Sequence, residues 1–346
     1  MKKLILLLFL VFALAPKGYA MEFTAPEVPK AAEDRMPENT TSFSDGFWEL
    51  VQSSLLALRP DIKEACAASL GVIAAVMLVS LLGSFQEGSQ SAANLVGCIT
   101  VGGTLMLRTN SMIHLGSETV LLLSDYGKLL FPIMTAALAA QGGVTSSAAL
   151  YTGTTVFDAV LGSLISRLLL PMAYLFLVLA VANSAVGENV LKRMRDFIKN
   201  SMSWCLKTLL TVFTTYMSIT GVVSGTTDAA ALKATKVTIS SVVPVVGGIL
   251  SDASEAVLVS AGVMKNAAGI YGILAVLAVF LEPFLRIGLH YLMLKATASI
   301  CAIFGSGRIT GLIEDFASAM GLLLAMTGAT CLLLLISTVC FMKGVG

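Results

Sequence analysis

Long apolar runs separated by single charged residues dominate this chain. Residues 65 to 86 and residues 88 to 107 contain no Asp, Glu, Lys or Arg. At about 1.5 Å per residue, a helix over either run is long enough to cross the roughly 30 Å hydrocarbon core of a bilayer. Other long apolar runs cover residues 168 to 186, 204 to 223 and 316 to 342. The pattern predicts an all-α, polytopic helical membrane protein.

Two further apolar segments, residues 129 to 140 and 237 to 251, are too short for a full crossing. Each has an early proline, and a second proline follows in a longer apolar segment: Pro132 with Pro171, and Pro244 with Pro283. The two proline pairs are offset by 112 residues. A recurring order of parts indicates duplication. We therefore expect a parallel internal repeat, with one copy over residues 126 to 223 and the other over residues 237 to 342.

A basic cluster predicts the orientation in the membrane. Lys192, Arg193, Arg195 and Lys199 stand close together in a short connection, and the positive-inside rule places such a connection in the cytoplasm. If the mature N-terminus lies outside, the short segments must enter and leave on the same face. The expected count is then about six transmembrane spans plus two re-entrant segments, residues 129 to 150 and 237 to 264.

The N-terminal region differs in composition from the rest. Residues 1 to 20 have two lysines, an apolar core and small residues before a cleavage position, which is typical of a signal peptide. An uncleaved anchor is the alternative. Residues 21 to 64 form an extracytoplasmic leader, in which apolar residues from Phe43 onward recur at helical spacing. This helix is expected in the membrane interface or docked on the spans. Residues 65 to 107 follow as two N-terminal spans.

Two carboxylates next to a predicted helix break form the first candidate functional site. Pro244, Gly247 and Gly248 interrupt an apolar run, and Asp252 and Glu255 follow them. Non-helical backbone at membrane depth is tolerated where water or protein satisfies it. The acids would share a helix face and bind a cation or carry a proton. Alternatively, they only solvate or cap the bend, and the first repeat has no matching acids.

Charged residues inside another apolar stretch form the second candidate site. Glu282, Arg286 and His290 follow one another at four-residue intervals, a spacing that allows an internal ion pair. Pairing removes much of the cost of placing charges in a membrane. A structural ion pair is the favoured interpretation, and a proton relay is the alternative.

Two helix faces complete the set of candidate pore or packing residues. Lys207 and Thr211 begin a polar stripe that continues to Thr214 and Ser218. The stripe suits a hydrated lumen or a polar helix contact, although threonines also bond to their own helix carbonyls. Gly321 belongs to a seam of small residues recurring every fourth position. Such a seam lets another helix approach closely, within one chain or in a homo-oligomer.

Composition narrows the class of function. The chain is 56% hydrophobic and only 12% charged, with a net charge of +1, so nothing in it supports nucleic-acid binding. Its six cysteines show no CxxC spacing, and it has only two histidines. It also lacks a phosphate-binding glycine loop with its lysine. We expect no catalytic residue, no metal and no cofactor, and therefore no enzyme.

Two longer stretches carry a resemblance to a known family. They are "KATKVTISSVVPVVGGILSDASEAVLVSAGVMKNAAGIYG" from Lys233 to Gly272, and "FLEPFLRIGLHY" at residues 280 to 291. With the signal peptide and leader, the chain resembles the stage III sporulation protein AE family of spore-forming bacteria. The resemblance implies a membrane subunit of the channel that joins mother cell and forespore, needed for late forespore gene expression. It carries over no catalytic residue.

The resemblance also implies partners and a location. The partners are other membrane proteins of the stage III sporulation operon, a cytoplasmic secretion-type ATPase and ring-forming proteins of the intermembrane space. The location is the mother-cell membrane around the forespore, with the N-terminus extracytoplasmic. An ion-coupled secondary transporter and a structural assembly platform are the alternative functions. A transporter would move substrate alone, whereas a channel subunit would need its partners.

Overall fold

The computed structural model describes residues 27–37, 42–84, 90–242, 247–304 and 307–343. Within these residues every regular element is a helix, which confirms the all-α prediction. The helices are α2 (Lys30–Glu33), α3 (Phe43–Ala57), α4 (Arg59–Ser84), α5 (Gln90–Ala140), α6 (Val144–Leu164), a π-helical turn η1 (Ile165–Leu169), α7 (Leu170–Val186), α8 (Asn189–Val242), α9 (Gly247–Phe304) and α10 (Gly307–Lys343). The predicted signal peptide lies outside the described residues.

Five helical stretches of the described chain are long and apolar enough to cross a membrane. They are Arg59–Leu81, Leu95–Ala140, Val144–Val186, Lys265–Ile303 and Gly307–Lys343. The chain is therefore a multi-pass helical membrane protein. Five of the six predicted spans lie mainly on these stretches, including the apolar segment with Pro283 on Lys265–Ile303. Residues 204 to 223 belong to α8, which is not among them. The predicted count of six spans is not confirmed.

The first expected re-entrant segment is not a separate element. Residues 129 to 140 continue α5, which runs unbroken from Gln90 with Pro132 inside it. A proline removes one helical hydrogen bond, but its neighbours Phe131, Met134 and Leu138 are buried in the core and hold the helix in place. The chain reverses only at residues 141 to 143, so the prediction of a short segment beginning at residue 129 is wrong.

The second expected re-entrant segment is likewise replaced by long helices. Its first residues end α8, which has 54 residues, and its last ones begin α9, which has 58. Gly247 and Gly248 form the first turn of α9, so they do not supply the non-helical backbone that the sequence predicted. Pro244 lies outside the described residues. Because Pro132 lies inside α5 and Pro244 lies outside the described residues, the internal repeat remains a prediction.

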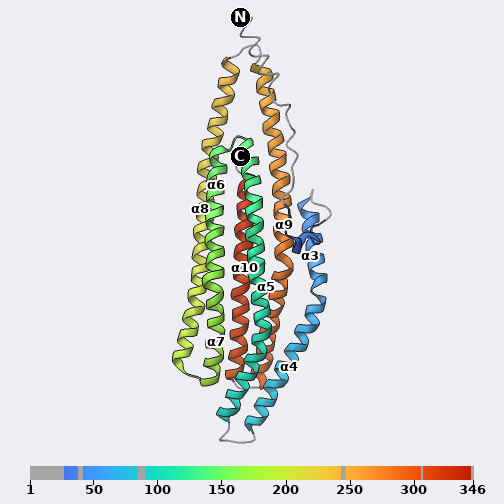
Figure 1. The fold of residues 1–346 in the computed structure, drawn as a ribbon, viewed down its shortest axis with the longest axis vertical. Coiled ribbons are helices and arrows are strands. Elements are labelled where there is room, and N and C mark those ends of the chain that lie inside the picture. Colours follow the sequence, from blue (N-terminus) through green and yellow to red (C-terminus); the bar gives the residue numbers. More distant parts are fainter. Residues whose placement is uncertain (1–26, 38–41, 85–89, 243–246, 305–306, 344–346) are drawn as a thin grey trace.

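Helix α10 occupies the centre of the bundle (Figure 1). It packs most extensively against α9 and α5, and it also contacts α6, α7 and α8. Its buried residues include large apolar side chains such as Phe316 and Phe341, together with Thr327 and Thr338, which donate to carbonyls of their own helix. A threonine hydroxyl that donates to a carbonyl of its own helix keeps its hydrogen bond when it is buried in an apolar core.

The two ends of the bundle differ. The turn between α7 and α8, where Gly187 has a φ of +82°, lies at the same end as the start of α10. The turn between α5 and α6 lies at the other end, near the end of α10 (Figure 1). Helices α8 and α9 extend beyond that turn and form the tip of the molecule.

The predicted N-terminal helix is present and docked on the protein. Helix α3 contacts α9 and α4, and it buries Gly46, Leu50 and Ser54. Trp48 points away from these contacts with 69% of its surface exposed. An exposed tryptophan beside a membrane bundle suits the lipid interface. Docking on the spans, one of the two alternatives, is therefore the observed arrangement.

Two glycines of α6 make a matched test of helix packing. A Cβ on Gly153 would overlap the ring of Tyr216 on α8, whereas a Cβ on Gly162 would meet nothing within 4 Å. Alanine favours a helix over glycine by about 1 kcal/mol. We expect Gly162→Ala to raise the melting temperature of the purified protein and Gly153→Ala to lower it. Equal melting temperatures for the two variants would contradict this packing.

Candidate functional site

An ion-pair network lies where α9 meets the N-terminal helices. Arg286 and Glu282 form the pair that their spacing predicted, with 2.9 Å between the guanidinium nitrogen and Oε1. Glu282 is buried, with 6% of its surface exposed. The structure adds a second cation, because Arg35 places its Nε 2.7 Å from the other carboxylate oxygen. One buried acid therefore binds two arginines from distant parts of the sequence.

Asp61 of α4 completes this network. Its Oδ2 lies 3.0 Å from Nε of Arg286. The four side chains carry two positive and two negative charges, so the network is neutral as a whole. Charge balance and mutual contact are what make buried ionised groups tolerable. The network joins α4, α9 and the segment that follows α2.

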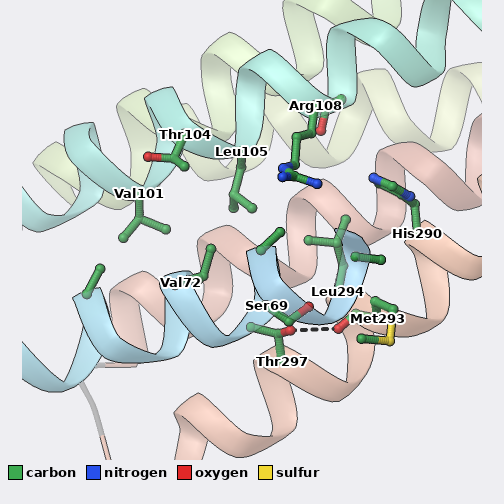
Figure 2. A pocket seen from close by; sticks show the side chains of 15 residues that line it. Ser69, Val72, Val101, Thr104, Leu105, Arg108, His290, Met293, Leu294 and Thr297 are labelled. Atoms are coloured by element: carbon green, nitrogen blue, oxygen red, sulfur yellow. Dashed lines mark hydrogen bonds between the residues drawn. The ribbon is translucent and has the colours of Figure 1, made fainter. Parts of the chain in front are cut away.

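A cavity of about 260 Å³ lies beside this network, between α4, α5 and α9 (Figure 2). Val72 and Val101 line one end of it, and Arg108 and His290 lie at the other. The third predicted residue of the charged series, His290, therefore borders the cavity. Arg108 also approaches Glu64 of α4, which is outside the lining, at 3.4 Å.

The basic end of the bundle holds a second, smaller network. Arg195 on α8 contacts Asp315 on α10 at 2.6 Å and its neighbour Asp196 at 2.8 Å, and Lys199 donates to Ser318. Burial lowers the pKa of Arg195, but the hydrogen bond to Asp196 and the charge of Asp315 outweigh it, so the pKa is raised. The cation therefore stays charged and fixes α8 against α10.

A polar cleft of about 400 Å³ opens at the same end. Its lining comes from the turn between α7 and α8 and from the first turns of α10. Side chains of both charges border it: Glu188, Lys192, Arg195, Arg308, Glu314 and Asp315. Oppositely charged groups at a rim favour specific recognition of a charged partner.

The polar stripe of α8 includes exposed residues, and a role at a hydrated lumen stays a prediction. Lys207 and Thr211 are exposed on the outside of the bundle. The Thr211 hydroxyl donates to the carbonyl of Lys207 at 2.9 Å. The Thr211 hydroxyl therefore has its hydrogen-bond acceptor within α8, which is one of the interpretations that the sequence allowed.

The small-residue seam of α10 packs within the chain. A Cβ on Gly321 would come within 3.4 Å of the Tyr291 ring on α9, and Ala317 and Ala329 are buried. The seam therefore contributes to the α9–α10 contact rather than requiring a second copy of the chain.

Asp252 and Glu255 lie in the first turns of α9. Their three-residue spacing on this helix places them on one face, as expected. Their side chains lie outside the described residues, so cation or proton binding at this place stays a prediction. Elsewhere in the described chain, no three or more His, Cys, Asp or Glu side chains are grouped so as to hold a metal ion.

The structure also contains a buried acid that the sequence analysis missed. Asp158 of α6 is buried and accepts a hydrogen bond of 2.7 Å from the Ser124 hydroxyl of α5. A lone acid in an apolar segment is a signal that could have been noticed. Its partner could not, because the spacing between helices is not visible in a local pattern.

Similar sequences are found among known protein families. The family model described as stage III sporulation protein AE matches residues 43–344. The curated stage III sporulation protein AE of Bacillus subtilis (strain 168) is 23% identical over 239 residues, which cover 68% of this chain and 59% of that protein. The match thus spans less than two thirds of the relative's length. No solved structure matches the chain. On the family match, the chain belongs to the stage III sporulation protein AE family.

Proposed function

We propose that the protein is a non-enzymatic membrane subunit of a sporulation-specific secretion or feeding channel between mother cell and forespore. The observation that carries this proposal is the family match over nearly all of the described bundle. The helical architecture supports it, because five apolar helices suit an integral subunit. In this role the chain supports late forespore gene expression without any chemistry of its own.

The proposed orientation places the basic end of the bundle in the cytoplasm of the mother cell. Lys192 and Arg193 are exposed there, as the positive-inside rule requires of a cytoplasmic connection. The tip formed by α8 and α9 then points away from the mother-cell cytoplasm, toward the intermembrane space (Figure 1). The partners divide accordingly, with a secretion-type ATPase at the basic end and ring-forming proteins at the tip.

The polar cleft at the basic end is the feature that suits the cytoplasmic partner. It is formed by two helix turns that the Arg195–Asp315 contact fixes relative to each other. A rigid, charged recess allows recognition without a large change of shape on binding. This arrangement supports an ATPase bound from the cytoplasm.

Purification from sporulating cells tests the proposed function. A tagged copy of the protein, solubilised in mild detergent, should recover the other stage III operon proteins and the ATPase in constant proportion. Reversing Arg195 and Asp315 in the double variant Arg195→Asp/Asp315→Arg keeps the pair between α8 and α10, removes the contact with Asp196 and changes the charges that border the cleft. We expect this variant to lose the ATPase and keep the other partners. Recovery of the tagged protein alone, at full membrane abundance, would contradict the proposal.

A variant of the two acids near the start of α9 distinguishes a channel subunit from an ion-coupled transporter. The double variant Asp252→Asn/Glu255→Gln keeps the size and hydrogen-bonding capacity of both side chains. If the acids only solvate the helix end, spore formation should stay at the wild-type level. Immunoblots of membranes should show equal abundance of the variant. A stable variant that fails to form spores would favour ion coupling, because removal of charge abolishes cation or proton binding.

A further inference from the structure

The cavity between α4, α5 and α9 has a wall made of small and apolar groups. Helix α4 contributes Ala68, Gly71 and Ala75 among other residues, and these leave open space where larger side chains would fill it. The hydroxyls of Thr104 and Thr297 donate to carbonyls of their own helices at 2.8 and 2.7 Å. The wall therefore offers methyl and methylene contacts and suits an apolar occupant.

The helices around the cavity indicate which part of a bilayer it would contact. All three helices around it belong to stretches apolar enough to cross a membrane. The charge-free run of α4 begins just after Glu64, and that of α5 ends just before Arg108. Because charged residues favour the head-group level over the hydrocarbon, the end of the cavity with Arg108 suits that level and the apolar end suits the acyl chains.

Arg108 lines one end of the cavity and forms a loose ion pair with Glu64, which lies next to the lining residue Ala65 but does not itself line the cavity. The side chain of Glu64 is 72% exposed and that of Arg108 is 36% exposed, and the two groups are 3.4 Å apart. A guanidinium has five donors and suits a phosphate, and an exposed carboxylate accepts from an ammonium. The pair therefore complements a zwitterionic head group better than a purely anionic one, which Glu64 would repel.

We propose that this cavity is a binding site for a phospholipid with a phosphoethanolamine head group. One acyl chain enters between α4, α5 and α9 toward Val72 and Val101. The phosphate binds Arg108 beside the His290 ring (Figure 2), and the ammonium binds Glu64, the ion-pair partner of Arg108. The lipid then contacts all three helices and adds to their packing beside the ion-pair network.

Filling the cavity tests the acyl-chain part of the site. The variant Ala68→Leu/Ala75→Leu places larger side chains in the cavity, while Ala67→Leu/Ala74→Leu adds the same atoms to exposed positions of the same helix. Native mass spectrometry of protein incubated with phosphatidylethanolamine would count bound lipids. Wild type and the Ala67/Ala74 variant should retain a tightly bound lipid that the Ala68/Ala75 variant loses. Equal retention by all three, or a cavity that holds detergent only, would overturn the proposal.

Changing the head-group contact provides a test that does not depend on core packing. Glu64 is exposed, so Glu64→Gln leaves the fold unchanged. Wild type should bind phosphatidylethanolamine about tenfold more tightly than phosphatidylglycerol, as a charge-assisted hydrogen bond to the ammonium would give. Glu64→Gln should abolish this preference, and Arg108→Gln should weaken both lipids. The absence of a preference in wild type, or its persistence in Glu64→Gln, would overturn the assignment.

Discussion

Removing the gene for this protein from its host should leave engulfment of the forespore complete and abolish late forespore transcription. The physical reason is that a channel subunit cannot be replaced by other chains if its helices form part of the conduit or its assembly surface. A fluorescent reporter under a late forespore promoter, followed with a membrane dye, would separate the two stages. The yield of heat-resistant spores should fall to background.

A wild-type copy at a second site is the control for this experiment and should restore spore yield. An earlier reporter, active before engulfment ends, should be unaffected in the deletion strain. Normal spore formation without the gene would rule out the proposed channel function. Arrest before engulfment would place the protein in an earlier step.

Glu282→Ala should have the largest effect on stability of any single substitution in the ion-pair network. It removes the carboxylate that contacts both Arg35 and Arg286, leaving two guanidinium groups with Asp61 as counter-charge. Breaking a buried pair from one side costs roughly 3–5 kcal/mol. The arginine side chains are 36% and 35% exposed, and this exposure lets water compensate part of the loss. We expect about 3 kcal/mol, measured by chemical unfolding in detergent micelles.

Glu314→Ala is the matched control, because Glu314 is an exposed acid on α10. It should change stability by less than about 0.5 kcal/mol, as surface substitutions do. Combining Glu282→Ala with Arg35→Ala should recover part of the loss, since one stranded cation is then absent. If Glu282→Ala is as stable as the control, the network does not hold the helices together.

The charged network shows how far sequence reasoning reached at this site. The Glu282–Arg286 pair was predictable because its spacing is a property of one helix. Arg35 and Asp61 were not, because their contacts depend on how α4 and the N-terminal segment pack on α9. No local pattern contains that information. For the same reason, the small-residue seam of Gly321 was recognised, but its partner on α9 was not.

The helix boundaries differ from the predicted ones for a different physical reason. Hydropathy divides a chain wherever charge interrupts an apolar run, and so it began one short segment after Lys128, with Pro132 inside it, and ended another segment at Glu87. The second division is consistent with the described helix ends, but α5 continues through Pro132 because its flanking residues are buried. Helices of 51 to 58 residues exceed what one bilayer crossing needs. A pattern method that assumes spans of ordinary length divides such helices into pieces.

Pro283 lies inside α9 directly after Glu282, so the ion-pair network holds the helix at the one place where a proline has removed a backbone hydrogen bond. The part of α9 from Pro283 back to Gly247 is about 54 Å long at 1.5 Å per residue. A change of direction of about 10° at Pro283 would carry the tip roughly 9 Å sideways by this length. The buried residues Leu274, Ala275 and Val276 oppose such a change, because they pack in the core on the tip side of Pro283. The salt bridges of Glu282 and this core packing therefore hold the direction of the part of α9 that leads to the tip.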